Sequence, residues 1–295
     1  MKRFQILYTV LIMINSSCVK NDVKGNLESC YSNTNAQYIF HNGTRREYEL
    51  YIPDSYDESS TSPLMLNFHG FGGSASNHMI NADFRALAES DAFILVYPQG
   101  SCSEGSPHWN PCPVGGDNKS TADDLGFVEA IIGDISSKYN LDMKRIYAAG
   151  YSNGAMMAYG LANYKSDLIA AVASVSGAML NCTGPTSHPM PVVHLHGTSD
   201  YVIPYEGGDY SAAQTTLDYW IDFNKASTKP TVTIDNSGGI SIEHYAYGQG
   251  DNSVSVEHYK YIGGDHVWFS ATYQGQSAAQ LVWNFVSDYD INGLR

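Results

Sequence analysis

Apolar positions along the chain fall into two spacings, one typical of buried strands and one typical of helices. Short apolar runs predict strands at residues 64–69, 92–97, 145–149, 168–175, 192–196, 231–234, 241–247 and 254–262. Apolar residues at helical spacing predict helices at residues 122–139, 155–164, 212–224 and 277–289. Thr121 or Asp123 is a suitable N-cap for the first of these helices.

The order of these segments predicts the fold class. Residues 36–40 and 45–52 flank Asn42-Gly43, a sequence typical of a hairpin turn. Residues 99–121 are rich in Gly, Pro, Ser and Cys and predict a long loop. Because most of the later strands alternate with helices, we predict an α/β fold with a mostly parallel central sheet flanked by helices.

The first 17 residues have the pattern of an export signal. A basic start precedes an apolar run at residues 6–14 and a short polar stretch. The run is too short to cross a bilayer as a helix. Small residues directly before Cys18 resemble a bacterial lipoprotein processing site, so lipidation of Cys18 and ordinary secretion both remain open. Residues 18–35 are polar and predict a tether, which leaves residues 36–295 as one domain.

The segment Gly150-Tyr151-Ser152-Asn153-Gly154 is the only G-x-S-x-G in the sequence. It follows the predicted strand at residues 145–149 and precedes the predicted helix at residues 155–164. Such a turn holds the serine at its tip and needs glycine on both sides, because neighbouring backbone passes too closely for a Cβ atom. The pattern predicts a nucleophile elbow with Ser152 as the attacking residue.

A serine hydroxyl needs a general base, and the base needs an orienting acid. After an elbow of this type the acid comes first along the chain and the histidine second. We select Asp200, just past the predicted strand at residues 192–196, and His266, in a glycine-flanked segment after the last predicted strand. The alternatives left open are the acids Asp209 and Asp265 and the histidines His188, His194, His196, His244 and His258.

A tetrahedral intermediate needs two N–H donors facing its oxyanion. One is expected from Asn153, the residue after the nucleophile. The other is expected from His69-Gly70-Phe71-Gly72-Gly73, which is similar to loops of the H-G-G-G type. We select the Phe71 N–H, with that of Gly70 as the alternative. The His69 side chain is expected to brace this loop.

These motifs, in this order, resemble the secreted α/β-hydrolase esterases grouped with polyhydroxybutyrate depolymerases and feruloyl or acetylxylan esterases. The resemblance runs from about residue 36 to residue 289 and implies an α/β-hydrolase fold with the triad Ser152, Asp200 and His266. It also includes Trp109-Asn110, Asp123-Asp124-Leu125-Gly126-Phe127, Arg145-Ile146-Tyr147, Pro204-Tyr205-Glu206-Gly207-Gly208 and Gly264-Asp265-His266-Val267-Trp268. The Val267-Trp268-Phe269-Ser270 sequence after His266 departs from the Thr-Trp-Pro run that is common in relatives, at the rim of the acyl pocket.

The sequence indicates no metal or cofactor. No pair of Cys or His residues has metal-ligand spacing with a third ligand nearby, and no dinucleotide-binding or Walker loop is present. Five cysteines are an odd number, and Cys18 at the export site leaves four in the body of the chain. Since Cys102 and Cys112 share the long loop, we predict the disulfides Cys102–Cys112 and Cys30–Cys182.

Aromatic and imidazole side chains within or beside the catalytic loops are candidates for substrate contacts. They could form a cleft for an aryl ester or a sugar, or they could pack the loops. The candidates are His69, Trp109, Tyr151, Tyr201 and Trp268.

The charge balance restricts the partners. With 16 Lys and Arg against 30 Asp and Glu, the chain carries a formal charge of −14, which argues against nucleic acid and anionic membranes. Removal of residues 1–17 takes away Lys2 and Arg3 and no acidic residue, so the charge becomes −16. We assign this surplus to solubility, and expect membrane attachment only through a lipid on Cys18.

Together these features predict an exported serine carboxylic-ester hydrolase, with its catalytic domain at residues 36–295. The resemblance implies feruloyl or acetyl esters of plant polysaccharide, or a polyester of the polyhydroxyalkanoate type, as substrates. A peptidase of the same fold is one alternative. A cytosolic thioester hydrolase is a second, disfavoured by the export signal and the cysteines. The third is a non-catalytic glycan-binding surface lipoprotein, disfavoured by the complete Ser-Asp-His set.

Overall fold

The computed structural model describes residue 30 and residues 36–295. Its strands are β1 (Gln37–His41), β2 (Thr44–Tyr51), β3 (Ser62–Phe68), β4 (Ile94–Pro98), β5 (Ser101–Ser103), β6 (Ser106–His108), β7 (Leu141–Tyr151), β8 (Ala171–Val175), β9 (Val192–Gly197), β10 (Thr231–Asp235), β11 (Ile242–Tyr247), β12 (Val256–Tyr261), β13 (Tyr289–Asp290) and β14 (Gly293–Leu294). Its helices are α2 (Ala75–Asn81), α3 (Arg85–Asp91), α4 (Asp124–Ser136), α5 (Asn153–Tyr164), α6 (Ala213–Phe223) and α7 (Ala278–Ser287), with a 3₁₀ turn η2 (Asp251–Ser253).

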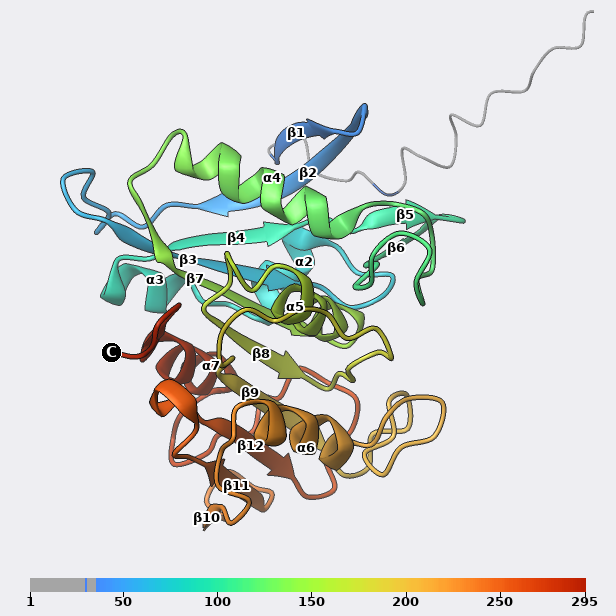
Figure 1. Cartoon of the computed structure of the whole chain (residues 1–295), viewed down its shortest axis with the longest axis vertical. Helices are drawn as coiled ribbons and strands as arrows, with labels where there is room; N and C mark the ends of the chain where they lie inside the picture. The colour runs from blue at the N-terminus through green and yellow to red at the C-terminus, as the bar shows by residue number, and fades with distance from the viewer. Residues whose placement is uncertain (1–29, 31–35) are drawn as a thin grey trace, which may run out of the picture.

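One ten-stranded sheet runs through the molecule in the order β1-β2-β4-β3-β7-β8-β9-β12-β11-β10 (Figure 1). The six central strands, β4-β3-β7-β8-β9-β12, are all parallel to one another. Antiparallel strands complete both edges, with β1 and β2 at one end and β10 and β11 at the other. The predicted α/β class with a mostly parallel sheet is therefore confirmed.

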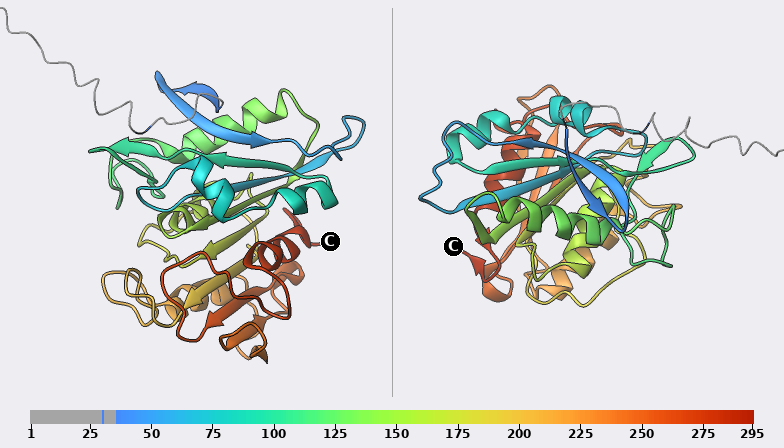
Figure 2. Two further views of the ribbon diagram at one scale, coloured as in Figure 1. Left: turned by 180° about the vertical axis from the view of Figure 1, so that it is seen from behind. Right: turned by 90° about the horizontal axis from the view of Figure 1, so that it is seen from above.

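Helices cover both faces of the sheet. Helices α4, α5 and α6 lie on one face, while α2, α3 and α7 lie on the other, as the view from behind shows (Figures 1 and 2). Strand residues alternate between two hydrophobic cores, because successive side chains of a strand point to opposite faces. On β3, Leu64 and Leu66 belong to the core with α4 and α5, whereas Met65 packs in the core with α3 and α7.

The elements missed by the sequence reasoning are short. Helices α2 and α3 have seven residues each, too few for a clear helical period. The small β5–β6 hairpin lies inside the expected loop at residues 99–121. Asp123 is the N-cap of α4, since its carboxylate accepts the N–H of Gly126 at 2.9 Å. Helix α7 begins with a capping box formed by Ser277 and Gln280.

The two disulfides differ from the predicted pairs. The structure pairs Cys30 with Cys102 and Cys112 with Cys182, with Cα–Cα distances of 6.0 and 5.8 Å. The prediction of Cys102–Cys112 and Cys30–Cys182 was wrong because the β5–β6 hairpin separates the two loop cysteines. After the hairpin the chain runs close to α5. The carbonyl oxygen of Pro111, the residue before Cys112, would lie only 2.2 Å from a Cβ atom built on Gly160 of that helix. The long loop is thus tied to two distant segments rather than to itself.

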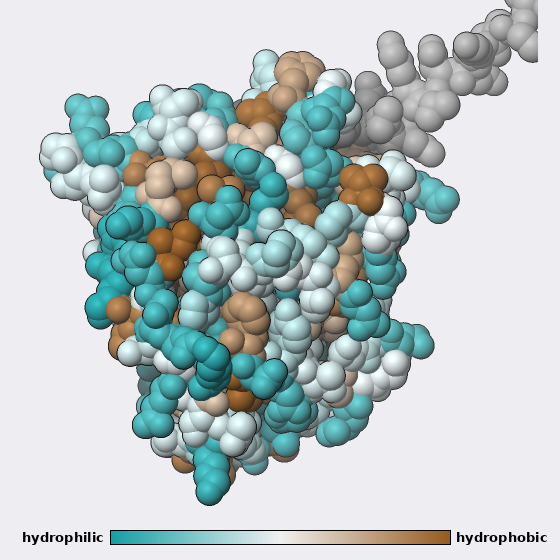
Figure 3. All heavy atoms as spheres, in the orientation of Figure 1, coloured by the Kyte–Doolittle hydropathy of each residue, from teal (hydrophilic) through white to brown (hydrophobic). Residues whose placement is uncertain are grey.

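No helix in the described part of the chain combines the length and the apolar character needed to cross a membrane. The expected export signal at residues 1–17, Cys18 and the expected tether apart from Cys30 lie outside the described residues. On the face seen in Figure 3, hydrophobic residues appear in several separate groups among hydrophilic ones. This pattern suits a chain with a formal charge of −14.

Candidate active site

Ser152 stands at the turn between β7 and α5, in a backbone conformation that few residues adopt. Its φ is 56° and its ψ is −119°, so the turn is strained. A Cβ atom on Gly150 would lie 2.2 Å from Gly154 O, and one on Gly154 would lie 2.1 Å from Phe68 O. Both glycines of the G-x-S-x-G sequence are therefore required by close backbone approach, as the sequence predicted.

The structure brings Ser152, His266 and Asp200 together from three parts of the chain. Ser152 Oγ lies 2.9 Å from His266 Nε2, and His266 Nδ1 lies 2.7 Å from Asp200 Oδ2. Asp200 follows β9, and His266 follows β12. Because β7, β9 and β12 are parallel, their carboxyl ends meet at one edge of the sheet, which explains how residues 114 and 66 positions apart come into contact.

The Asp200 carboxylate is buried and saturated with donors. Oδ1 accepts the backbone N–H groups of Val202 at 2.9 Å and Ile203 at 2.8 Å. Oδ2 faces His266 Nδ1 at 2.7 Å and His196 Nε2 at 3.2 Å. Burial by itself raises the pKa of Asp200, but hydrogen bonds from His196, His266 and Ile203 outweigh it and hold that pKa well below its ordinary value. Asp200 is thus a carboxylate at neutral pH.

Tyr151, directly before the nucleophile, ties the histidine loop to the elbow. Its hydroxyl donates to the backbone carbonyl of His266 at 2.8 Å, and the two rings lie with centroids 5.1 Å apart. Burial and the nearby Asp200 carboxylate raise the pKa of Tyr151 to about 12, so the hydroxyl remains a donor across the physiological range.

The loop after β3 lies beside Ser152, as expected for an oxyanion hole. A Cβ atom on Gly70 would lie 3.3 Å from Ser152 Cβ. Among the described residues, no acceptor is hydrogen-bonded to the N–H groups of Phe71 and Asn153. The Phe71 side chain points into solvent, 54% exposed, with Lys119 Nζ 5.0 Å from its ring centre.

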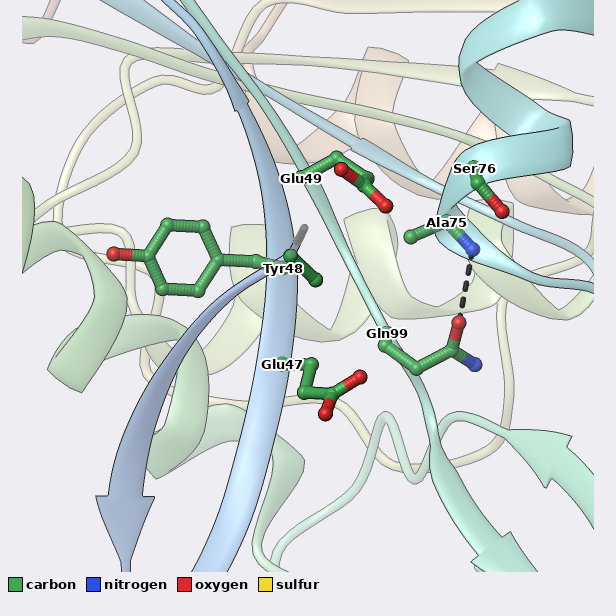
Figure 4. A pocket seen from close by; sticks show the side chains of 7 residues that line it. Glu47, Tyr48, Glu49, Ala75, Ser76 and Gln99 are labelled. Carbon is green, nitrogen blue, oxygen red and sulfur yellow. Dashed lines mark hydrogen bonds between the residues drawn. The ribbon is translucent and has the colours of Figure 1, made fainter. Parts of the chain in front are cut away.

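His69 braces this loop from beneath. Its Nδ1–H donates to Gly70 O at 2.7 Å, and its Nε2 accepts the Gly100 N–H at 2.9 Å. Burial lowers the pKa of His69 to about 4, which keeps the imidazole neutral. Gln99 extends the brace: its Nε2 lies 3.2 Å from His69 Nε2, while its Oε1 accepts the Ala75 N–H at the start of α2 (Figure 4).

Asn153 joins the elbow to the long loop. Its Oδ1 accepts the Trp109 N–H at 2.7 Å, and its Nδ2 lies 3.2 Å from the Trp109 carbonyl oxygen. The Trp109 indole N–H donates to His69 O at 2.9 Å, and its ring packs edge-on against Phe68. The loop at residues 99–121 is therefore locked to both halves of the expected oxyanion hole.

The predicted substrate contacts separate into packing residues and exposed residues. His69 and Trp109 are 1% and 0% exposed, so of the two roles considered for them, contact with substrate and packing of the loops, the structure shows packing, and their place among the candidate substrate contacts is corrected. Trp268 is half-buried against His78 and Phe84. Tyr201, beside Asp200, is 81% exposed and remains a candidate for contact with substrate.

Asp124, in the first turn of α4, has a structural role to which the sequence reasoning assigned no residue. Asp124 is 1% exposed, and its carboxylate pairs with Arg46 at 2.6 Å. It also accepts Ser101 Oγ at 3.1 Å and the backbone and side-chain N–H groups of Asn110 at 2.9 and 2.7 Å. The signal that could have found it was the presence of both Trp109-Asn110 and Asp123-Asp124 in the family resemblance, because Asn110 and Asp124 are direct partners.

The alternative bases have other partners. His188 Nε2 lies 3.0 Å from Ile169 O and its Nδ1 lies 2.8 Å from Pro189 O, while His244 pairs with Glu257 at 2.8 Å. The alternative acids Asp209 and Asp265 are exposed. In the described part of the chain, no group of three His, Cys, Asp or Glu side chains is arranged to hold a metal ion.

A family model described as phospholipase/carboxylesterase matches residues 56–233. The chain belongs to this family of α/β hydrolases. The match covers the oxyanion loop, the elbow and Asp200, so the family resemblance drawn from the motifs is confirmed.

Curated relatives and solved structures agree with the family. The chain is 30% identical over 252 residues to a bifunctional acetylxylan esterase/xylanase from Neocallimastix patriciarum, covering 85% of this chain and 34% of the relative. It is 28% identical to feruloyl esterase B from Piromyces equi, covering 68% of this chain and 39% of the relative. The chain thus spans little more than a third of these relatives. The acetyl xylan esterase from Aspergillus awamori superimposes with a TM-score of 0.65 at 15% identity, over 85% of this chain and 98% of that one, which shows a shared fold.

Proposed function

We propose that this chain is a serine carboxylesterase that cleaves esters through an acyl-enzyme. The observation that carries the proposal is a pair of hydrogen bonds: Ser152 Oγ lies 2.9 Å from His266 Nε2, and His266 Nδ1 lies 2.7 Å from Asp200 Oδ2. This is the arrangement that nucleophile activation requires: a base in contact with the hydroxyl and an acid that orients the base.

In the first half-reaction Ser152 Oγ attacks the ester carbonyl carbon while His266 Nε2 takes its proton. The negative charge on the carbonyl oxygen is held by the N–H groups of Asn153 and Phe71. Collapse of this intermediate breaks the bond to the alcohol, which leaves with the proton from His266. Asp200 stabilises the protonated imidazole and keeps its Nε2 directed at the reacting atoms.

In the second half-reaction water replaces the alcohol. His266 removes a proton from the water, whose oxygen attacks the acyl carbon, and the same two N–H groups hold the oxyanion. The intermediate then releases the acid and returns the proton to Ser152 Oγ. No step requires a metal or an organic cofactor.

We propose as substrates feruloyl or acetyl esters attached to plant polysaccharide, or a polyester of the polyhydroxyalkanoate type. Support comes from the two relatives described above, one an acetylxylan esterase/xylanase and the other a feruloyl esterase. We further propose that the enzyme acts outside the cytoplasm, because disulfides such as Cys30–Cys102 and Cys112–Cys182 are typical of oxidising compartments.

The test is hydrolysis of p-nitrophenyl butyrate by the native chain and by Ser152→Ala. We expect kcat/KM to fall by about 10⁴-fold or more, because the nucleophile is lost, with an unchanged thermal transition. Undiminished activity in a folded Ser152→Ala variant would contradict the proposal.

Product analysis on methyl ferulate, acetylated xylan and poly(3-hydroxybutyrate) then separates the proposed substrates. An amide panel run beside these esters distinguishes a peptidase of the same fold. Glycan retention without labelling by a fluorophosphonate would instead indicate a binding protein.

A further inference from the structure

A cluster of buried histidines lies behind Asp200 and takes no part in the chemistry described above. His194 and His196 lie two residues apart on β9, so they share one face of the sheet, and His258 joins them from β12. None of the three is more than 2% exposed. Burial in this cluster lowers the pKa of His194 well below its ordinary value and that of His258 to about 3, so both imidazoles are neutral.

The hydrogen bonds of His196 fix the position of its proton. His196 Nε2 lies 2.9 Å from the carbonyl oxygen of Ile203. A carbonyl oxygen only accepts, so Nε2 carries the hydrogen. Asp200 Oδ2 lies 3.2 Å from the same nitrogen, so the Nε2–H that is bonded to Ile203 also places its positive end close to the carboxylate.

The second ring nitrogen of His196 extends this chain of hydrogen bonds into the core. In this Nε2–H tautomer the His196 Nδ1 is an acceptor, and it receives the Nε2–H of His194 at 3.0 Å. His194 Nδ1 is then an acceptor too, and it receives the hydroxyls of Tyr159 at 2.9 Å and Ser174 at 3.1 Å. Every donor in this chain points toward Asp200.

We propose that His196, held in one tautomer by Ile203 and His194, is a positioning residue that keeps the Asp200 carboxylate charged and aimed at His266. The backbone of Ile203 is hydrogen-bonded to both residues: its N–H donates to Asp200 Oδ1 at 2.8 Å, and its carbonyl oxygen accepts the His196 N–H. This inference rests on the proposed esterase function, in which Asp200 orients the general base.

The other titratable and charged groups around His196 have partners of their own. The Tyr205 ring lies edge-on to His196, with centroids 5.6 Å apart, and its hydroxyl is bonded to His258 Nε2 at 2.9 Å. Lys260 is the partner of His196 in the pairing of β12 with β9, and its Nζ lies 5.4 Å from the Tyr205 ring centre and 3.8 Å from Glu243. Within the described residues, His196 is thus the side chain of β9 whose ring nitrogen lies beside the Asp200 carboxylate, 3.2 Å from Oδ2.

Three variants test this inference. His196→Phe fills the same space without a donor, whereas His196→Gln can present an amide N–H to the same oxygens. His258→Phe is the matched control, since His258 is equally buried in the same cluster and does not contact Asp200. Each variant is titrated with a fluorophosphonate, and kcat is expressed per labelled serine so that misfolded protein does not count.

We expect His196→Phe to lower kcat by about 10- to 100-fold with KM changed by less than about threefold, short of the about 10⁴-fold loss typical when the triad acid itself is replaced. His196→Gln and His258→Phe should stay within about threefold of the native kcat. An equal loss in His196→Phe and His258→Phe, or no recovery in His196→Gln, would overturn the inference.

A second measurement is independent of activity. In protein labelled with nitrogen-15, the His196 ring should show the nitrogen shifts of an Nε2–H tautomer, and Asp200→Asn should perturb them more than Ser152→Ala does. A native protein that shows this tautomer but hydrolyses no ester would contradict the proposed function and leave the contact with Asp200 intact. An Nδ1–H tautomer would contradict the inference alone.

Discussion

The hydroxyl of Tyr151 donates a hydrogen bond of 2.8 Å to the backbone carbonyl of His266, so the residue before the nucleophile also holds the loop of the base. The same ring closes against the oxyanion loop, where a Cβ atom on Gly70 would lie 3.0 Å from Tyr151 Cδ1. One side chain therefore contacts the elbow, the oxyanion loop and the histidine loop.

This contact predicts the effect of Tyr151→Phe. Loss of one hydrogen bond of about 1 kcal/mol should lower kcat by about fivefold through looser positioning of His266, with little change in the thermal transition. Tyr38→Phe is the control, because the Tyr38 side chain is 53% exposed on β1, the edge strand of the sheet, and should leave kcat on p-nitrophenyl butyrate unchanged. Equal effects of the two substitutions on kcat would contradict a positioning role for Tyr151.

The close packing of the elbow predicts opposite results for two glycine substitutions. Gly154→Ala places a Cβ atom 2.1 Å from Phe68 O, and should cost about 3 kcal/mol or more because backbone has to move. Gly133→Ala lies in α4, where a Cβ atom meets nothing within 4 Å, and should stabilise the fold by about 0.5–1 kcal/mol. Urea unfolding of the two variants measures both values, and a native-like Gly154→Ala would show that the elbow tolerates a side chain.

The buried histidines predict a loss of stability in mild acid. Burial lowers the pKa of His69 to about 4 and those of His78 and His258 to about 3, whereas an unfolded chain protonates its histidines near pH 6.5. The unfolded state therefore binds more protons below about pH 6.5. The buried neutral histidines therefore contribute fully to the free energy of unfolding above about pH 6.5. This contribution is lost as the pH falls toward 4, at about 1.4 kcal/mol per pH unit for each histidine.

Urea unfolding at pH 7, 6 and 5 measures this slope. His78→Gln should remove the contribution of one histidine to this pH dependence, since His78 is buried and bonded to Asn67. A free energy of unfolding that does not change between pH 7 and pH 5 would show that these side chains titrate normally in the folded protein.

The disulfides predict both a connectivity and a stability effect. Peptide mapping without reduction should recover Cys30 linked to Cys102 and Cys112 linked to Cys182. Replacing Cys112 and Cys182 together with Ser should cost about 4 kcal/mol, because the bridge closes a loop with a sequence separation of 70. The Cys30/Cys102 double variant, with a separation of 72, is a matched comparison for stability. A linked Cys102–Cys112 peptide would contradict the structure.

Much of the fold could be predicted from the sequence, because local patterns of apolar and polar residues determine the individual strands and helices. Strands such as β9 and helices such as α5 were predicted to within a few residues from apolar spacing alone. Helices α2 and α3 were missed because seven residues are too few to establish a period. The hairpin β5–β6 was missed because Ser, Pro, Gly and Cys predict a loop whatever their pairing.

The sequence by itself determined the residues that meet at Ser152. The strained turn demands Gly150 and Gly154, and the order of motifs along the chain singled out Asp200 and His266. Only the tertiary structure decided the parts that depend on contacts between distant segments: the pairing of Cys102 with Cys30, the clamp of Asn153 on Trp109, and the contact of His196 with Asp200. The physical reason is that a turn or a helix leaves its signature in neighbouring residues, whereas a buried hydrogen bond between two loops leaves none until the sheet has placed the strand ends side by side.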